Sequence, residues 1–101
     1  MNYTRISTYD LMKGDFHELS GLVEKGILPK LVTEPGFVDY GLVDVGNNKV
    51  VAISIWETRE EAQKSAGIAA SWVKETISDR VRLITTSIGD MTLFHGVPVA
   101  A

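Results

Sequence analysis

The sequence contains no cysteine, so it has no disulfide framework and no thiol for catalysis or metal binding. Basic residues are also scarce, because ten Lys and Arg against thirteen Asp and Glu give a net charge of −3. A protein that binds a nucleic-acid backbone needs a basic patch, and no cluster of Lys and Arg occurs here. We therefore expect no nucleic-acid partner.

Long apolar runs are missing as well. No segment approaches the roughly 18 apolar residues that cross a bilayer, and the first ten residues, MNYTRISTYD, lack the pattern of a signal peptide. We therefore expect no membrane association and a cytoplasmic location. A chain of 101 residues with 45% hydrophobic and 23% charged residues is typical of one soluble domain, expected over residues 1–101.

The motifs of common active sites are absent too. The two histidines, His17 and His95, lie far apart in the sequence and fit no metal-binding spacing. The nine glycines form no phosphate-binding loop, and no nucleophile-elbow motif occurs. The sequence therefore predicts neither a metal nor a cofactor.

The strongest local pattern lies in residues 48–61, NKVVAISIWETREE. Residues 50–56 are almost all apolar and favour β-structure, which predicts a central strand. Thr58 and Glu61 then form a T-x-x-E capping box that starts a helix, expected over residues 59–77. One face of that helix carries small side chains, including Ala62, Ala66 and Ala69. Such a face lets the helix lie close to the sheet or leaves room beside it.

Three other segments are expected to be strands, because they are rich in β-favouring residues and end at turn residues: residues 3–9, 37–45 and 82–88. Residues 46–48, Gly-Asn-Asn, tolerate positive φ and should close a hairpin with the central strand. Residues 89–90 predict a bulge or turn before extended structure resumes at residues 91–95.

A further helix is expected to begin after Asp15, whose side chain can cap it, with Glu18 reaching back. Gly26 and Pro29 interrupt the helical spacing, so a break near Gly26 should precede a second helical piece over residues 27–32. The resulting order predicts an α+β, ferredoxin-like βαββαβ fold with a four-stranded antiparallel sheet. Right-handed crossovers place both helices on one face of that sheet.

The central strand is apolar on both of its faces. Its two rows are Val50, Ala52 and Trp56 on one side and Val51, Ile53 and Ile55 on the other. Since the helices can cover only one face, the second face would remain open and apolar. We therefore predict a homodimer that packs sheet against sheet.

Trp56 shares a strand face with Ser54 and Ala52, so one large ring stands beside two small side chains. This combination can leave a pocket between sheet and helices. Alternatively, the small-residue face of the helix over residues 59–77 fills the space and Trp56 simply packs in the core.

The sequence contains two motifs, P-G-F-x-x-Y at residues 35–40 and V-V-x-I-S-x-W-E-x-x-E-E-A at residues 50–62, and its strands and helices are predicted in the order βαββαβ. In both respects the chain resembles the antibiotic biosynthesis monooxygenase family of the dimeric α/β-barrel superfamily. The resemblance implies a homodimer whose two sheets form a barrel, with a pocket for a small flat organic molecule in each subunit. Members of the family include cofactor-free monooxygenases, haem-degrading enzymes and modifiers of signalling molecules.

The chain departs from the family at the catalytic positions. The cofactor-free oxygenases resemble one another in an Asn four residues before the strand tryptophan, where this sequence has Ala52. The Asn, Trp and His of the haem degraders correspond to positions near Thr4, Ser65 and Glu75. These departures argue against haem degradation. They leave two hypotheses: a cofactor-independent monooxygenase, or a non-catalytic small-molecule-binding or assembly module on the same scaffold.

Cofactor-free oxygenation needs a substrate that is readily deprotonated to an electron-rich carbanion, and polar groups that stabilise it. Trp56 can stack on a flat substrate, while hydrogen bonds can come from Ser54, Tyr40, Thr4 and His17. These five are the predicted ligand-binding residues. No catalytic acid–base pair can be identified from the sequence.

Overall fold

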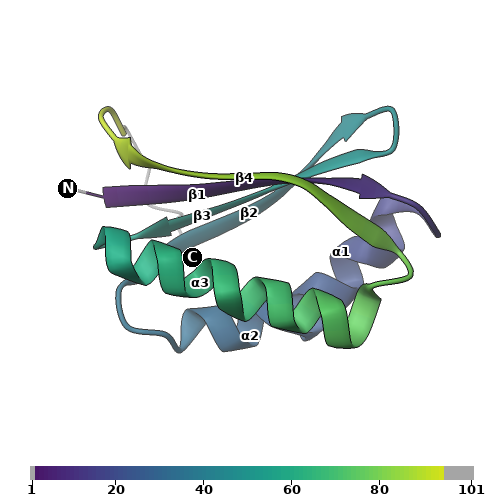
Figure 1. Cartoon of the computed structure of the whole chain (residues 1–101), viewed down its shortest axis with the longest axis horizontal. Helices are drawn as coiled ribbons and strands as arrows, with labels where there is room; N and C mark the ends of the chain where they lie inside the picture. The colour runs from purple at the N-terminus through teal and green to yellow at the C-terminus, as the bar shows by residue number, and fades with distance from the viewer. Residues whose placement is uncertain (1, 95–101) are drawn as a thin grey trace, which may run out of the picture.

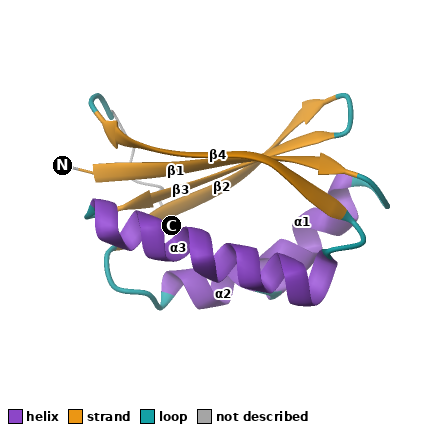
Figure 2. Cartoon of the chain, viewed as in Figure 1, coloured by secondary structure: helices purple, strands orange, loops and turns teal. Residues whose placement is uncertain are grey.

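The computed structural model describes residues 2–94, which form one four-stranded antiparallel sheet with the helices on one face (Figures 1 and 2). The strands are β1 (Asn2–Leu11), β2 (Phe37–Gly46), β3 (Lys49–Trp56) and β4 (Val81–Met91). The helices are α1 (Phe16–Lys25), α2 (Ile27–Val32) and α3 (Arg59–Trp72), which continues into the π-helical turn η1 (Val73–Ile77). The strand order β2-β3-β1-β4 confirms the predicted ferredoxin-like fold. Within the described residues no helix is long and apolar enough to cross a membrane.

Both long helices begin at the predicted caps. The Thr58 hydroxyl accepts the Glu61 N–H at 3.2 Å, and the Glu61 carboxylate accepts the Thr58 N–H at 3.1 Å, which completes the capping box of α3. Asp15 caps α1 by accepting the Glu18 N–H at 2.8 Å. The Glu18 carboxylate instead accepts from Arg80 at 3.0 Å, so this second box is only half formed.

Two predicted changes of chain direction are confirmed, the helix break at Gly26 and the hairpin turn at residues 46–48. Gly26 separates α1 from α2, and a Cβ added to it would collide with the indole ring of Trp72. Glycine therefore allows α3 to approach the corner between α1 and α2. Residues 46–48 adopt φ values of 84°, 53° and 57° and close the β2–β3 hairpin.

The bulge expected at residues 89–90 is wrong, because these residues pair in regular register with residues 3–4 of β1. The register of β1 against β4 shifts instead at residues 8–9, where Ile84 is the extra residue on β4. A glycine within a strand does not by itself require a bulge. β4 ends at Met91, so residues 92–94 do not continue the strand, and His95 lies outside the described residues.

The helix expected over residues 59–77 is α-helical only as far as Trp72. Its last five residues form η1, and the Val73 N–H at the junction is shared between the carbonyls of Ala69 and Ala70. The apolar spacing of this segment does not distinguish an α-turn from the wider π-turn. The π-turn presents Val73 and Ile77 toward the sheet, where both line a cavity.

The sheet has one covered face and one open face (Figure 1). On β3 the row that faces the helices is at most 5% exposed: Val50, Ala52, Ser54 and Trp56. The opposite row contains Val51, Ile53 and Ile55, which pair with neighbours that also point away from the helices. Among those neighbours, Ile6 is 43% exposed and Val43 is 42% exposed. The predicted two-sided character of the central strand is confirmed.

Candidate functional site

The covered face of the sheet contains a buried cation, Arg5, which is only 2% exposed. It lies on β1 opposite Ser54 of β3 and beneath α3. Its Nε–H donates to the Ser65 hydroxyl of α3 at 2.9 Å, and its Nη1 donates to the Ser7 hydroxyl at 2.9 Å. Both acceptors are neutral, so neither compensates the positive charge.

Among the described residues, Arg5 differs from the other arginines in lacking a carboxylate partner. The others pair at 3.3, 3.0 and 2.8 Å respectively: Arg59 with Asp90, Arg80 with Glu18, and Arg82 with Asp10. Over residues 2–94, Arg5 makes no ion pair. Burial lowers the pKa of its guanidinium from the ordinary value, while Tyr9 and Tyr40 act in the opposite direction. An unpaired charge in a core is costly, so this site requires a specific explanation.

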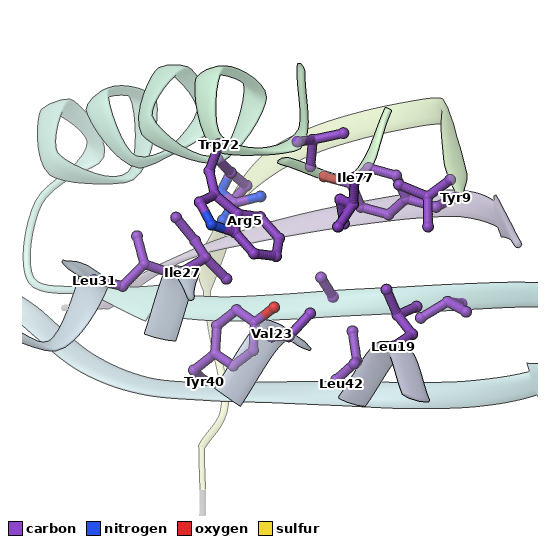
Figure 3. A pocket seen from close by; sticks show the side chains of 15 residues that line it. Arg5, Tyr9, Leu19, Val23, Ile27, Leu31, Tyr40, Leu42, Trp72 and Ile77 are labelled. Atoms are coloured by element: carbon purple, nitrogen blue, oxygen red, sulfur yellow. The ribbon is translucent and has the colours of Figure 1, made fainter. Parts of the chain in front are cut away.

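A cavity of about 40 Å³ lies beside Arg5, between the sheet and the helices. Most of its walls are aliphatic side chains, which come from all the helical elements and from β2, β3 and β4. Figure 3 shows Arg5 and Trp72 together on one side and Tyr40 on the other, with its hydroxyl turned inward. The space is large enough for water. A benzene-sized ligand needs about 150 Å³, so the cavity must widen to accept a ring.

The polar groups of this cavity are donors and a cation. Burial raises the pKa of Tyr40 to about 12, although the charge of Arg5 favours the phenolate. Tyr40 is therefore a protonated hydrogen-bond donor at neutral pH. None of the 15 residues that line the cavity is Asp, Glu or His, so their side chains include no general base for neutral pH.

A second space, a groove of about 250 Å³, lies between β1 and β4 on one side and α3 and η1 on the other. Arg5, Tyr9 and Val73 belong to the walls of both the groove and the cavity. The small side chains of Ala66 and Ala70 leave the groove open at α3. Further polar side chains in its lining are Ser7, Lys74, Ser78 and Thr86. The two spaces together surround Arg5 with apolar wall and hydroxyl groups.

Ser54 and Trp56, two of the predicted ligand-binding residues, pack together in the core. The Trp56 Nε1–H donates to the Ser54 hydroxyl at 2.9 Å, and its ring meets Phe37 edge to face with centroids 5.5 Å apart. Trp56 is 1% exposed and Ser54 is completely buried. Neither lines the cavity or the groove, so the packing alternative describes their arrangement here.

The other three predicted residues are separated from one another. Tyr40 lines the cavity. Thr4 pairs with Ile55, which points away from the helices, so Thr4 lies on the opposite face of the sheet. His17 is exposed in the first turn of α1. The structure therefore does not gather the five predicted residues into one site.

Sequence reasoning missed Arg5, Tyr9 and Trp72 as residues around a cavity. The alternation along β1 places Arg5 and Tyr9 on one strand face, but an arginine in such a row usually marks the solvent side. Its hydrogen bonds to Ser7 and Ser65 could not be predicted from the sequence, because they depend on how the fold places these side chains. Residues 2–94 also contain no group of three His, Cys, Asp or Glu side chains suited to a metal ion.

No protein-family model matches the sequence, and no curated protein matches it. Solved structures do match. A single-residue mutant of SnoaB, a cofactor-independent oxygenase from Streptomyces nogalater, is 14% identical and aligns over 92% of this chain and 95% of that one, with a TM-score of 0.71. A candidate antibiotic biosynthesis monooxygenase from Chloroflexus aurantiacus is 13% identical over 97% of this chain and 100% of that one, with a TM-score of 0.68.

An uncharacterised NIPSNAP-like domain protein from Burkholderia xenovorans is 21% identical over 96% of this chain and 91% of that one, with a TM-score of 0.64. Identities this low establish a shared fold and leave chemistry to the individual site. The chain has the fold of the antibiotic biosynthesis monooxygenase-like proteins, as its motifs predicted.

Proposed function

We propose that this protein binds a small, flat, largely apolar organic molecule between its sheet and its helices. The observation that carries the proposal is the pair of mostly apolar spaces, cavity and groove, whose walls share Arg5, Tyr9 and Val73. The groove of about 250 Å³ has room for an aromatic body. The smaller cavity, of about 40 Å³, accepts a ring only if its lining side chains move apart.

Calorimetric titration with dihydroxynaphthalenes tests this proposal. The matched variants are Ala70→Leu, which fills the groove, and Ser71→Leu, which adds the same side chain to an exposed neighbouring position outside it. We expect saturable binding to the wild type and to Ser71→Leu, and a loss of at least about tenfold in affinity for Ala70→Leu. Absence of saturable binding for every flat aromatic compound tried would overturn the proposal.

The catalytic form of the proposal is a cofactor-independent monooxygenase. SnoaB, which shares the fold, is described as a cofactor-independent oxygenase. Arg5 supplies a positive charge that can stabilise an oxyanion of the substrate. Because the cavity side chains include no base, the substrate must be acidic enough to ionise without one. Oxygen uptake with dihydroxynaphthalenes and no added cofactor, above the rate in buffer, supports this form.

The alternative is a non-catalytic binding or assembly module. Ala52 stands where the cofactor-free oxygenases have an amide, and the absence of Asp, Glu and His from the cavity lining favours the same alternative. In that case the wild type would bind the dihydroxynaphthalene saturably and give no oxygen uptake above the rate in buffer. The same two measurements therefore separate the two functions.

We further propose a homodimer that buries the open face of the sheet. This face carries apolar side chains on the three strands β1, β3 and β2, where Ile6 pairs with Ile53 and Val43 pairs with Val51. Sedimentation should give a dimer for the wild type and for Met12→Lys, a change at an exposed position after β1. Ile53→Lys should give a monomer. An 11 kDa wild-type species at micromolar concentration would contradict the dimer.

A further inference from the structure

We propose that Arg5 is the receptor for one anionic oxygen group, so that the preferred ligand is a flat aromatic monoanion. The charged group is a carboxylate or an ionised hydroxyl on the ring. This inference rests on the proposed function, because it assigns the chemistry of the molecule that occupies the cavity and the groove.

The first argument is the uncompensated charge. Arg5 is the most buried arginine of the described chain and the only one without a carboxylate there. A hydroxyl acceptor orients a guanidinium but leaves its net charge in place. Removing an ion from water is repaid only when an opposite charge accompanies it. A bound anion would supply that charge.

The second argument is the geometry of the donors. Nε and Nη1 of Arg5 are held by Ser65 and Ser7, each at 2.9 Å, which fixes the plane of the guanidinium. The Tyr9 side chain also hydrogen-bonds to the guanidinium, and none of these three partners carries a carboxylate. Because Arg5 lines both spaces, an oxygen in either can reach the guanidinium. Tyr40 and Tyr9, also in the cavity lining, can donate to the same oxygen.

The third argument concerns the body of the ligand. An inorganic anion would leave the apolar walls of both spaces in contact with water, whereas an aromatic ring fits against Ala66, Ala70 and Val73 in the groove. A second negative charge at the far end of the ring would find no second buried cation, because Lys74, the other cation of the groove lining, is exposed to water. The site therefore favours one charge over two.

Calorimetric titration with two probes of matched shape tests the inference: 2-naphthoate, a monoanion, and 2-naphthalenemethanol, which is neutral. We expect the wild type to bind 2-naphthoate at least about tenfold more tightly than the alcohol. Arg5→Met, which keeps the length of the side chain but removes its charge, should lose this preference. Arg5→Lys should keep part of it. The dianion naphthalene-2,6-dicarboxylate should bind at least about tenfold more weakly than 2-naphthoate.

The outcomes separate the inference from the function on which it rests. If the wild type binds both naphthalene probes equally well, the anion inference is overturned and the proposed function stands. If neither probe and no other flat aromatic compound binds, both are overturned. A preference for 2-naphthoate that survives in folded Arg5→Met would assign the anion to another residue and overturn the role of Arg5.

A second measurement uses only the wild-type protein and so does not depend on the folding of a variant. The absorbance of 4-nitrophenol reports its ionisation, and a receptor for an anionic oxygen binds the phenolate more tightly than the phenol. We expect the pKa of bound 4-nitrophenol to fall by about one unit or more. An unchanged or raised pKa would overturn the inference for ionised hydroxyls, while the naphthoate comparison decides it for carboxylates.

Discussion

The Nε–H of Arg5 on β1 donates to the hydroxyl of Ser65 on α3 at 2.9 Å, and the same hydroxyl donates to the backbone carbonyl of Ala62 at 2.6 Å. Ser65 is therefore oriented by its own helix to accept from the guanidinium. The hydrogen bond ties the sheet to the helix that covers it. Because Ser65 is neutral, it holds Arg5 in place and leaves the charge available to a ligand.

Replacing Ser65 with alanine should destabilise the fold. The change leaves a donor of a buried cation without an acceptor, which costs about 1–3 kcal/mol of the free energy of unfolding. The matched control is Ser71→Ala on the exposed side of the same helix, which we expect to change stability by less than about 0.5 kcal/mol. Urea unfolding of the two variants checks the difference, and equal effects would contradict a specific role for the Arg5–Ser65 bond.

The fold could be predicted because its signals are local. The T-x-x-E box at residues 58–61 and the Gly-Asn-Asn turn at residues 46–48 act within a few residues, and both form as expected. The period-two pattern of β3 likewise indicated two apolar faces, of which the helices could cover only one. Such features depend on backbone geometry and neighbouring side chains, which a single sequence contains.

The site could be predicted only in part, because it depends on contacts between distant segments. Tyr40 was identified and lines the cavity, but the hydrogen bond between Arg5 and Ser65 joins residues 60 positions apart. The surroundings of Trp56 could not be predicted either, because Phe37 from another strand packs against its ring. Strand spacing gives the face of a side chain and does not say whether its neighbours leave a cavity.

Replacing Gly26 with alanine should force Trp72 out of its position. A Cβ at Gly26 would overlap the indole ring, so we expect a loss of about 1–3 kcal/mol in the free energy of unfolding and a shifted tryptophan emission. Gly21→Ala is the control, since a Cβ there meets no atom within 4 Å and the residue lies inside α1. Alanine at Gly21 should stabilise the helix by about 0.5–1 kcal/mol. Urea unfolding followed by fluorescence measures both effects, and two variants of equal stability would contradict the clash.

Tyr40 should make stability fall in alkaline solution. Its pKa of about 12 in the folded protein exceeds the ordinary value of about 10 expected for the unfolded chain. Between these values the unfolded chain loses the phenolic proton first, so the folded state binds more protons and stability decreases as pH rises. Near pH 11 this contribution reaches about 1 kcal/mol.

Urea unfolding of the wild type and of Tyr40→Phe at about pH 8 and about pH 11 measures that contribution as a difference. Other titrating groups affect both proteins alike and cancel. We expect the wild type to lose about 1 kcal/mol more than Tyr40→Phe between the two conditions. Parallel losses would show that the buried phenol of Tyr40 does not cause the alkaline decline.

The two tryptophans should respond differently to the same substitution. Trp56→Phe removes the donor to the buried Ser54 hydroxyl and should cost about 1–3 kcal/mol of stability. Because Trp56 lines neither the cavity nor the groove, the affinity of the folded variant for 2-naphthoate should stay within about twofold of the wild type. Trp72→Phe changes a wall of the cavity beside Arg5 and should alter that affinity several-fold.

Calorimetric titration and urea unfolding of both variants separate binding from stability. A loss of affinity at Trp56→Phe that exceeds the loss at Trp72→Phe would mean that the bound protein rearranges to expose the Trp56 ring. That result would restore the stacking role that the sequence predicts for Trp56, and it would require the Phe37 ring to move away. The opposite result would place the ligand at Arg5 and Trp72. Trp56 would then support the site only by packing in the core.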